Sequence, residues 1–136
     1  MSSKIRLLRS AALSDVAEYA YGAVVPPDSQ LVFAAGACPL DEDGVTVAVG
    51  DYAGQARQMM HNLETALAEA GARLSDVVKT TVYVASSSQQ DLVAAWQVVR
   101  DHFGDHDPPS TLLGVTVLGY HDQLVEIDAV AALSAS

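Results

Sequence analysis

A single acidic residue in an apolar setting is the first candidate for chemistry in this sequence. Glu126 stands between Val125 and Ile127, inside the largely apolar stretch Leu124–Leu133. An unpaired carboxylate is costly in such a place unless it is exposed or hydrogen-bonded. Glu126 is therefore either a general acid or base in a cleft, or an acid that pairs with a donor across a subunit interface.

Cysteine and histidine offer weaker candidates. Cys38 has no histidine near it in sequence, so a small core residue is a better interpretation than a nucleophile. His102 and His106 have helical spacing, but Gly104 is expected to end the helix between them, and no third ligand follows, so we predict no metal site. His121 lies in a loop and could fold back over a cleft, although an exposed turn histidine is the usual outcome.

Two helices are expected to position these residues. Asp51 is a plausible N-cap and Gly71 a plausible stop for a helix of about twenty residues. Its apolar face is formed by Tyr52, Ala56, Met59, Met60, Leu63, Leu67 and Ala70. A serine cluster at 86–88 precedes a second helix that ends at Gly104, with an apolar stripe of Leu92, Trp96, Val99 and Phe103.

The remaining apolar segments are typical of strands. They are Tyr19–Val25, Leu31–Ala37, Val77–Ala85, Thr111–Leu118 and Leu124–Leu133. We expect the first two and the last two to form antiparallel hairpins, and the helical crossovers to join parallel strands. The prediction is an α+β fold, a single-domain mixed β-sheet of about six strands with two helices packed on one face. The other face would keep apolar side chains, such as those alternating through 124–130, so an oligomer is the simplest way to cover it.

Length and composition limit the functional classes. The 136 residues suit one domain, 1–136, and half of them are apolar. The formal net charge of −10, with only seven dispersed cations, disfavours nucleic-acid binding. The apolar runs are too short to span a membrane. The N-terminal stretch with Lys4, Arg6 and Arg9 has no signal-peptide pattern, and the single cysteine forms no intrachain disulfide, so a cytoplasmic location is expected.

Four segments together resemble the RidA/YjgF family. The run 31–36 followed by Pro39-Leu40 is similar to the family's apolar strand, Ser-Gly-Gln, x, Pro segment, and 55–58 with Asn62-Leu63 is similar to its first helix. The passage 70–72 followed by 76–84 matches the family's helix-to-strand sequence. Pro108-Pro109-Ser110-Thr111, Leu118 and 125–127 match its C-terminal signature except at one position. The resemblance covers roughly residues 15 to 133.

This resemblance implies a homotrimer with small-molecule clefts between subunits and no metal or organic cofactor. Members with the full signature hydrolyse two-iminocarboxylates and related enamines to ketoacids and ammonia. In them an arginine binds the substrate carboxylate and a glutamate, here Glu126, handles the water. The resemblance also places Tyr19, Trp96 and Gly36 at the cleft. Tyr19 could equally fill a strand surface, and the only tryptophan, Trp96, lies on an apolar stripe that is more often core than a platform for a ligand.

The chain departs from the family where the arginine is expected, because Ser110 stands there. A short hydroxyl cannot neutralise a carboxylate. Arg100, one turn after Trp96, is the next cation that might reach the cleft, although a solvated arginine is the more usual outcome. The Ser-Gly-Gln segment has also become Ala35-Gly36-Ala37, which removes a polar side chain from the cleft wall.

Two functional hypotheses follow, and a third ranks last. The first is hydrolytic deamination, or related water or proton transfer, on an imine or enamine other than the usual two-iminocarboxylates, with Glu126 as the catalytic residue and Tyr19, Gly36, Ser110 and Trp96 binding substrate. The alternative is a trimer that binds or senses a metabolite without chemistry. A ribonuclease or translation inhibitor is disfavoured by the charge.

Overall fold

A four-stranded mixed sheet forms the centre of the molecule, in a computed structural model that describes residues 5–134. Its order is β3 (Gln30–Ala37), β6 (Val125–Leu133), β4 (Val77–Ala85) and β5 (Ser110–Val115). β6 runs antiparallel to both of its neighbours, and β4 and β5 are parallel. The helical crossover between β4 and β5 produces this parallel pair, as expected from the order of the elements. The expected closing hairpin between the last two strands is wrong, because β4 lies between β5 and β6.

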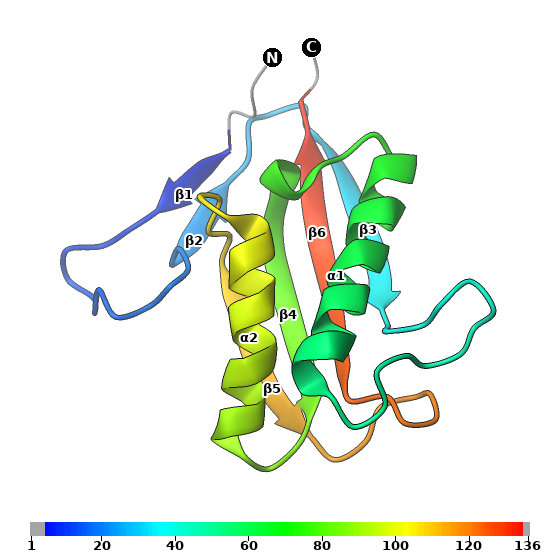
Figure 1. Cartoon of the computed structure of the whole chain (residues 1–136). Coiled ribbons are helices and arrows are strands. Elements are labelled where there is room, and N and C mark those ends of the chain that lie inside the picture. The colour runs from blue at the N-terminus through cyan, green and yellow to red at the C-terminus, as the bar shows by residue number, and fades with distance from the viewer. Residues whose placement is uncertain (1–4, 135–136) are drawn as a thin grey trace.

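Two helices cover one face of this sheet (Figure 1), which confirms the predicted α+β fold. α1 (Tyr52–Glu69) packs on β6 and β3, and α2 (Gln89–Phe103) packs on β4 and β5. The Asp51 carboxylate caps α1 by accepting a hydrogen bond from the amide of Gly54 at 2.9 Å. Gly71, with φ of +79°, follows the last turn of α1, where a left-handed conformation favours glycine. A short 3-10 helix, η1 (Leu74–Asp76), leads into β4.

The core lies between the helices and the sheet. It is built from one stripe of each helix and from alternate residues of the strands. Its fully buried members include Met59, Met60, Leu63 and Leu67 of α1, Val99 of α2, and Val82, Val84, Val125 and Ile127 of the sheet. No helix among residues 5–134 is long and apolar enough to cross a membrane. Lys4, one of the cations named above, lies outside the described residues.

The N-terminal strands differ from the prediction. β2 (Gly22–Val24) pairs with β1 (Arg6–Leu8) in a separate two-stranded sheet, so the expected hairpin between Tyr19–Val25 and Leu31–Ala37 is wrong. Pro26 and Pro27 interrupt the chain between the two segments, and neither can donate a hydrogen bond to a ladder. The amide of Ala20 instead donates to the carbonyl of Asp107 at 2.9 Å, which ties this segment to the loop after α2.

The open face of the sheet is also different from the expectation. Val125, Ile127 and Ala129 point to the helices and are buried, so the apolar residues of 124–130 that were assigned to the open face lie mostly in the core. Strand alternation then places Glu126 on the opposite face. The apolar exposure of that face is greatest on β3, where Phe33 is 73% exposed and Leu31 is 49% exposed, and Leu113 of β5 adds to it. The sheet therefore still presents an apolar margin, beside a polar centre.

Candidate functional site

The carboxylate of Glu126 is held by one of its two oxygens. Oε1 accepts hydrogen bonds from Gln123 Nε2 at 3.0 Å and from the Cys38 thiol at 3.3 Å. Oε2 lies over the α-carbon of Gly36, so close that a β-carbon on Gly36 would collide with it. Within residues 5–134, Oε2 has no hydrogen-bond partner of its own. One oxygen is thus fixed by protein donors and the other is available to a ligand or a water.

Gln123 is the residue that fixes this arrangement, and sequence reasoning missed it. Its side chain is buried, with 5% of the residue exposed. Its Nε2 also donates to the Val125 carbonyl at 2.9 Å, and its Oε1 accepts from the amide of Tyr120 at 3.0 Å. All polar atoms of the amide are therefore paired, which holds the donor to Glu126 in one orientation. The sequence signal that could have identified it is a glutamine three residues before Glu126, just ahead of the buried strand β6.

Cys38 completes the cluster as a neutral donor. Partial burial raises the pKa of its thiol to about 11, and the hydrogen bond to Glu126 and the charge of that carboxylate add to the effect. The thiol therefore stays protonated at neutral pH and is a poor nucleophile, as the sequence indicated. Its position is different from the core position expected, because the side chain lies against Glu126.

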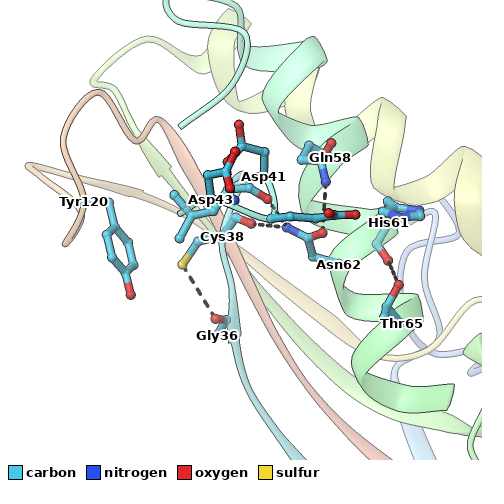
Figure 2. Close-up of a pocket in the computed structure, with 11 residues that line it drawn as sticks. Gly36, Cys38, Asp41, Asp43, Gln58, His61, Asn62, Thr65 and Tyr120 are labelled. Carbon is cyan, nitrogen blue, oxygen red and sulfur yellow. Dashed lines mark hydrogen bonds between the residues drawn. The ribbon is translucent and has the colours of Figure 1, made fainter. Parts of the chain in front are cut away.

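A groove of about 800 Å³ opens beside this cluster. Figure 2 shows Gly36 and Cys38 at the end of β3, facing a polar surface of α1 that carries Gln58, His61 and Asn62. Asn62 Nδ2 donates to the carbonyls of Cys38 and Leu40, at 2.8 and 2.9 Å, which fixes the loop after β3. Asp41, Glu42 and Asp43 line the same groove. Their charges disfavour an anionic ligand on this side.

The other predicted residues gather around a second cavity. It has a volume of about 340 Å³ and is lined by Tyr19, Trp96, Ser110, Thr111 and Leu112. The rings of Tyr19 and Trp96 meet edge to face, with centroids 6.0 Å apart. The hydroxyl oxygen of Ser110 lies 2.6 Å from that of Thr80, which is buried. Ser110 thus shares the helix side of the sheet with Thr80.

The structure divides the predicted site residues between the two faces of the sheet. Glu126 and Gly36 lie on the open face. Together with Gln123 and Cys38 they form what we call the acid half-site. Tyr19, Trp96 and Ser110 lie at the edge of the sheet beyond β4, on the helix side. We call these three residues the aromatic half-site. The strand β4 separates the two half-sites, so one chain does not bring them together.

Neither proposed substitute for the missing arginine is free at these half-sites. The Arg100 guanidinium forms an ion pair with Glu18 and lies 3.5 Å from Asp101. Trp96 Nε1 donates to the second oxygen of the Glu18 carboxylate at 3.1 Å. His121 is 97% exposed and lies beside Asp122, so it does not fold over Glu126.

His102 and His106 contact different backbone carbonyls, Val98 at 2.9 Å and Val77 at 2.7 Å. Across residues 5–134 there is no group of three or more His, Cys, Asp or Glu side chains placed to hold a metal ion.

Comparison with known proteins places this geometry among relatives. Residues 10–133 match the family model described as Endoribonuclease L-PSP. A RutC family protein of Pyrococcus abyssi is 34% identical over 100 residues, which cover 74% of this chain and 76% of the relative. The 3-aminoacrylate deaminase RutC of Acinetobacter baylyi is 32% identical over 101 residues, covering 74% and 78% of the two chains.

Solved structures agree. A Rid family protein of Yersinia pestis has a TM-score of 0.86 at 25% identity, covering 95% of this chain and 98% of that one. A Mycobacterium tuberculosis member of the YjgF/YER057c/UK114 family has a TM-score of 0.63 at 30% identity, with coverage of 95% and 99%. The described elements of this chain therefore have counterparts over nearly the whole length of both structures.

Proposed function

This chain belongs to the RidA/YjgF family, and from that premise we propose that it forms a homotrimer with metabolite-binding clefts between its subunits. In those clefts it would hydrolyse an imine or enamine that carries no carboxylate. The observation that carries the proposal is the Glu126 carboxylate, which is anchored through Oε1, while Oε2 lies over Gly36 and has no hydrogen-bond partner in the described part of the chain.

The division of the site supports the proposed assembly. The acid half-site and the aromatic half-site lie on opposite faces of one sheet, so a cleft that uses both must take them from two subunits. Phe33 and Leu31, exposed on the open face, supply apolar area for such a contact. A trimer would have a mass three times that of the 14.2 kDa chain, and light scattering that gives the monomer mass would exclude the shared cleft.

The proposed reaction uses Glu126 Oε2 as a general base. Water adds to the carbon of the C=N bond, whose nitrogen has taken a proton from solvent, while Oε2 accepts one of the water protons, which gives a neutral carbinolamine. The protonated carboxyl group then returns this proton to the amine nitrogen. The C–N bond breaks with release of ammonia, and the hydroxyl proton passes to Oε2, which leaves the new carbonyl group. General acid–base catalysis of this kind contributes about 10² to 10⁴ in rate. The reaction needs no cofactor.

The substrate class follows from the aromatic half-site. Ser110 supplies a hydroxyl already paired with Thr80, and Arg100 is already paired with Glu18. Among the described residues that line this half-site and the crevice next to it, no unpaired guanidinium is left for a carboxylate. We therefore expect 3-aminoacrylate, the substrate in the name of the Acinetobacter relative, and two-iminocarboxylates to react about a hundredfold or more slowly than in a family member with the arginine.

The test is a trapping assay. An amine oxidase generates an uncharged imine, and semicarbazide traps it. Accelerated hydrolysis diverts the imine to its carbonyl product, which reacts with semicarbazide more slowly, and so lowers the initial rate of semicarbazone formation. We expect wild type to lower it and Glu126→Gln to lose the effect while keeping the oligomer mass and melting temperature. Asp128→Asn is the matched control, because Asp128 lies two residues along the same face of β6. Equal activity of wild type and Glu126→Gln would refute the catalytic role. A trimer that binds the imine made by the oxidase, but does not accelerate its hydrolysis, would indicate a binding protein instead.

A further inference from the structure

One ion pair beside the aromatic half-site has no role in the proposed reaction. Glu18 lies just before Tyr19, and its carboxylate receives Arg100 on one oxygen and Trp96 Nε1 on the other. Glu18 thereby connects the segment before β2 to the outer side of α2. The tryptophan donor holds the carboxylate in the position from which it faces the guanidinium.

Arg100 is the cation best placed to serve this half-site. A narrow crevice next to the 340 Å³ cavity is lined by both Arg100 and Ser110, with Trp96 bordering both spaces. Among the described residues that line these two spaces, Arg100 is the only lysine or arginine. Lys79 Nζ donates a hydrogen bond to the Thr111 hydroxyl at 2.7 Å, but Lys79 lines neither space.

We propose that Glu18 is a specificity-determining residue, which excludes carboxylate substrates by occupying Arg100. This inference rests on the proposed function, since it concerns the same cleft. The two partners are 43% and 44% exposed, and half-exposed pairs of this kind form and break readily. Glu18 nevertheless binds the Arg100 guanidinium in preference to a dissolved carboxylate, because a tethered group acts at an effective concentration in about the millimolar range.

Removal of the Glu18 charge should leave the guanidinium with only its longer contact, to Asp101 at 3.5 Å, so that it can turn to bind a carboxylate in a bidentate manner. Glutamine is the suitable replacement, because its side-chain oxygen can still accept the Trp96 hydrogen bond. The expected phenotype is a gain of binding, which distinguishes this proposal from general damage to the fold.

The experiment compares pyruvate, as a carboxylate probe, with pyruvamide, its neutral counterpart, by titration calorimetry. We expect Glu18→Gln to bind pyruvate about threefold to fivefold more tightly than wild type, the range that a half-exposed ion pair can account for, and pyruvamide equally well. The double variant Glu18→Gln/Arg100→Met should lose the gain. Asp101→Asn is the matched control, because Asp101 also contacts Arg100, at 3.5 Å, but does not contact Trp96, and it should change little.

Unchanged pyruvate affinity in Glu18→Gln, or a gain that persists without Arg100, would overturn the proposal. Glu18→Ala provides a second variant with the same expected gain if the glutamine protein folds poorly. The measurement is repeated with Glu126→Gln added, where catalysis is absent. A pyruvate gain in that background supports the specificity role even if the imine assay fails, so the two failures can be told apart.

Discussion

The acid half-site and the aromatic half-site are built on different physical principles. Glu126 is held by buried or half-buried neutral donors, Gln123 and Cys38, that are themselves fixed by the strand and the loop around it. The aromatic half-site depends instead on a half-exposed ion pair between segments 82 residues apart. The first arrangement suits a group that must be oriented for chemistry, and the second suits selection of the ligand. Variants of the first should therefore change kcat, and variants of the second KM.

Gly36→Ala should have the largest effect. The new β-carbon would collide with Glu126 Oε2, and the flexible end of the glutamate can move aside. We expect kcat for imine hydrolysis to fall about a hundredfold, in the range of a lost general base, while the melting temperature stays nearly constant. Gly119→Ala is the control, because a β-carbon there meets open space. Full activity in Gly36→Ala would show that Oε2 does not work from this position.

Gln123→Leu should have the next largest effect. It removes the donor to Glu126 Oε1 and leaves the Tyr120 amide without its partner, which costs about 1–3 kcal/mol of stability. We expect kcat to fall about tenfold with little change in KM, because the carboxylate is still present but less well oriented. Chemical denaturation measures the stability, and steady-state kinetics measure the separate changes in kcat and KM. A rise in KM alone would move Gln123 from orientation of Glu126 to ligand binding.

Trp96→Phe should act on the other half-site. Phenylalanine keeps an aromatic ring beside Tyr19 but removes the Nε1 donor to Glu18. Loss of such a peripheral hydrogen bond is expected to raise KM by about threefold to tenfold and to leave kcat unchanged. The kinetic split is the readout. A fall in kcat equal to that of Gln123→Leu would erase the distinction between the half-sites.

The sequence predicted local features better than their assembly. The Asp51 cap and Gly71 determined α1, and the apolar stripe around Val99 and Phe103 determined α2, because these signals act within a few residues. Strand alternation identified β6 but did not say which set of side chains faces the helices, since both sets include apolar residues. This is why the open face was predicted to be more apolar than it is.

Pairings between distant segments were not visible in the sequence. The partner of β2 is β1 and not β3. The sequence did not predict this, because nothing in the pattern of 19–37 indicates that Ala20 contacts Asp107. The ion pair between Glu18 and Arg100 joins two such distant segments, and nothing in the sequence around Glu18 indicates it. The predicted division of site residues between two subunits likewise depends on which face each strand residue occupies, and this emerged only from the register of the sheet.

The smallest effect on activity is expected from Cys38. Because the fold raises the pKa of the thiol to about 11, the protonated form is favoured in the folded state relative to the unfolded chain. At pH 8 only about one thiol in a thousand is then ionised, so alkylation by iodoacetamide should be slow and should accelerate toward pH 11. Cys38→Ser should keep imine hydrolysis within about twofold, since a hydroxyl can donate the same hydrogen bond.

The charge of Glu126 is one cause of the raised thiol pKa, so the two residues report on each other. Glu126→Gln should lower the pKa of Cys38 and shift the pH profile of alkylation to lower pH, whereas Asp128→Asn should leave it unchanged. The same linkage predicts that the folded state loses stability as pH rises from the ordinary value of 9.0 toward about 11, because ionisation is then easier in the unfolded chain. An alkylation profile that does not shift in Glu126→Gln would mean that the thiol does not face the carboxylate in solution, and the acid half-site would then rest on Gln123 alone.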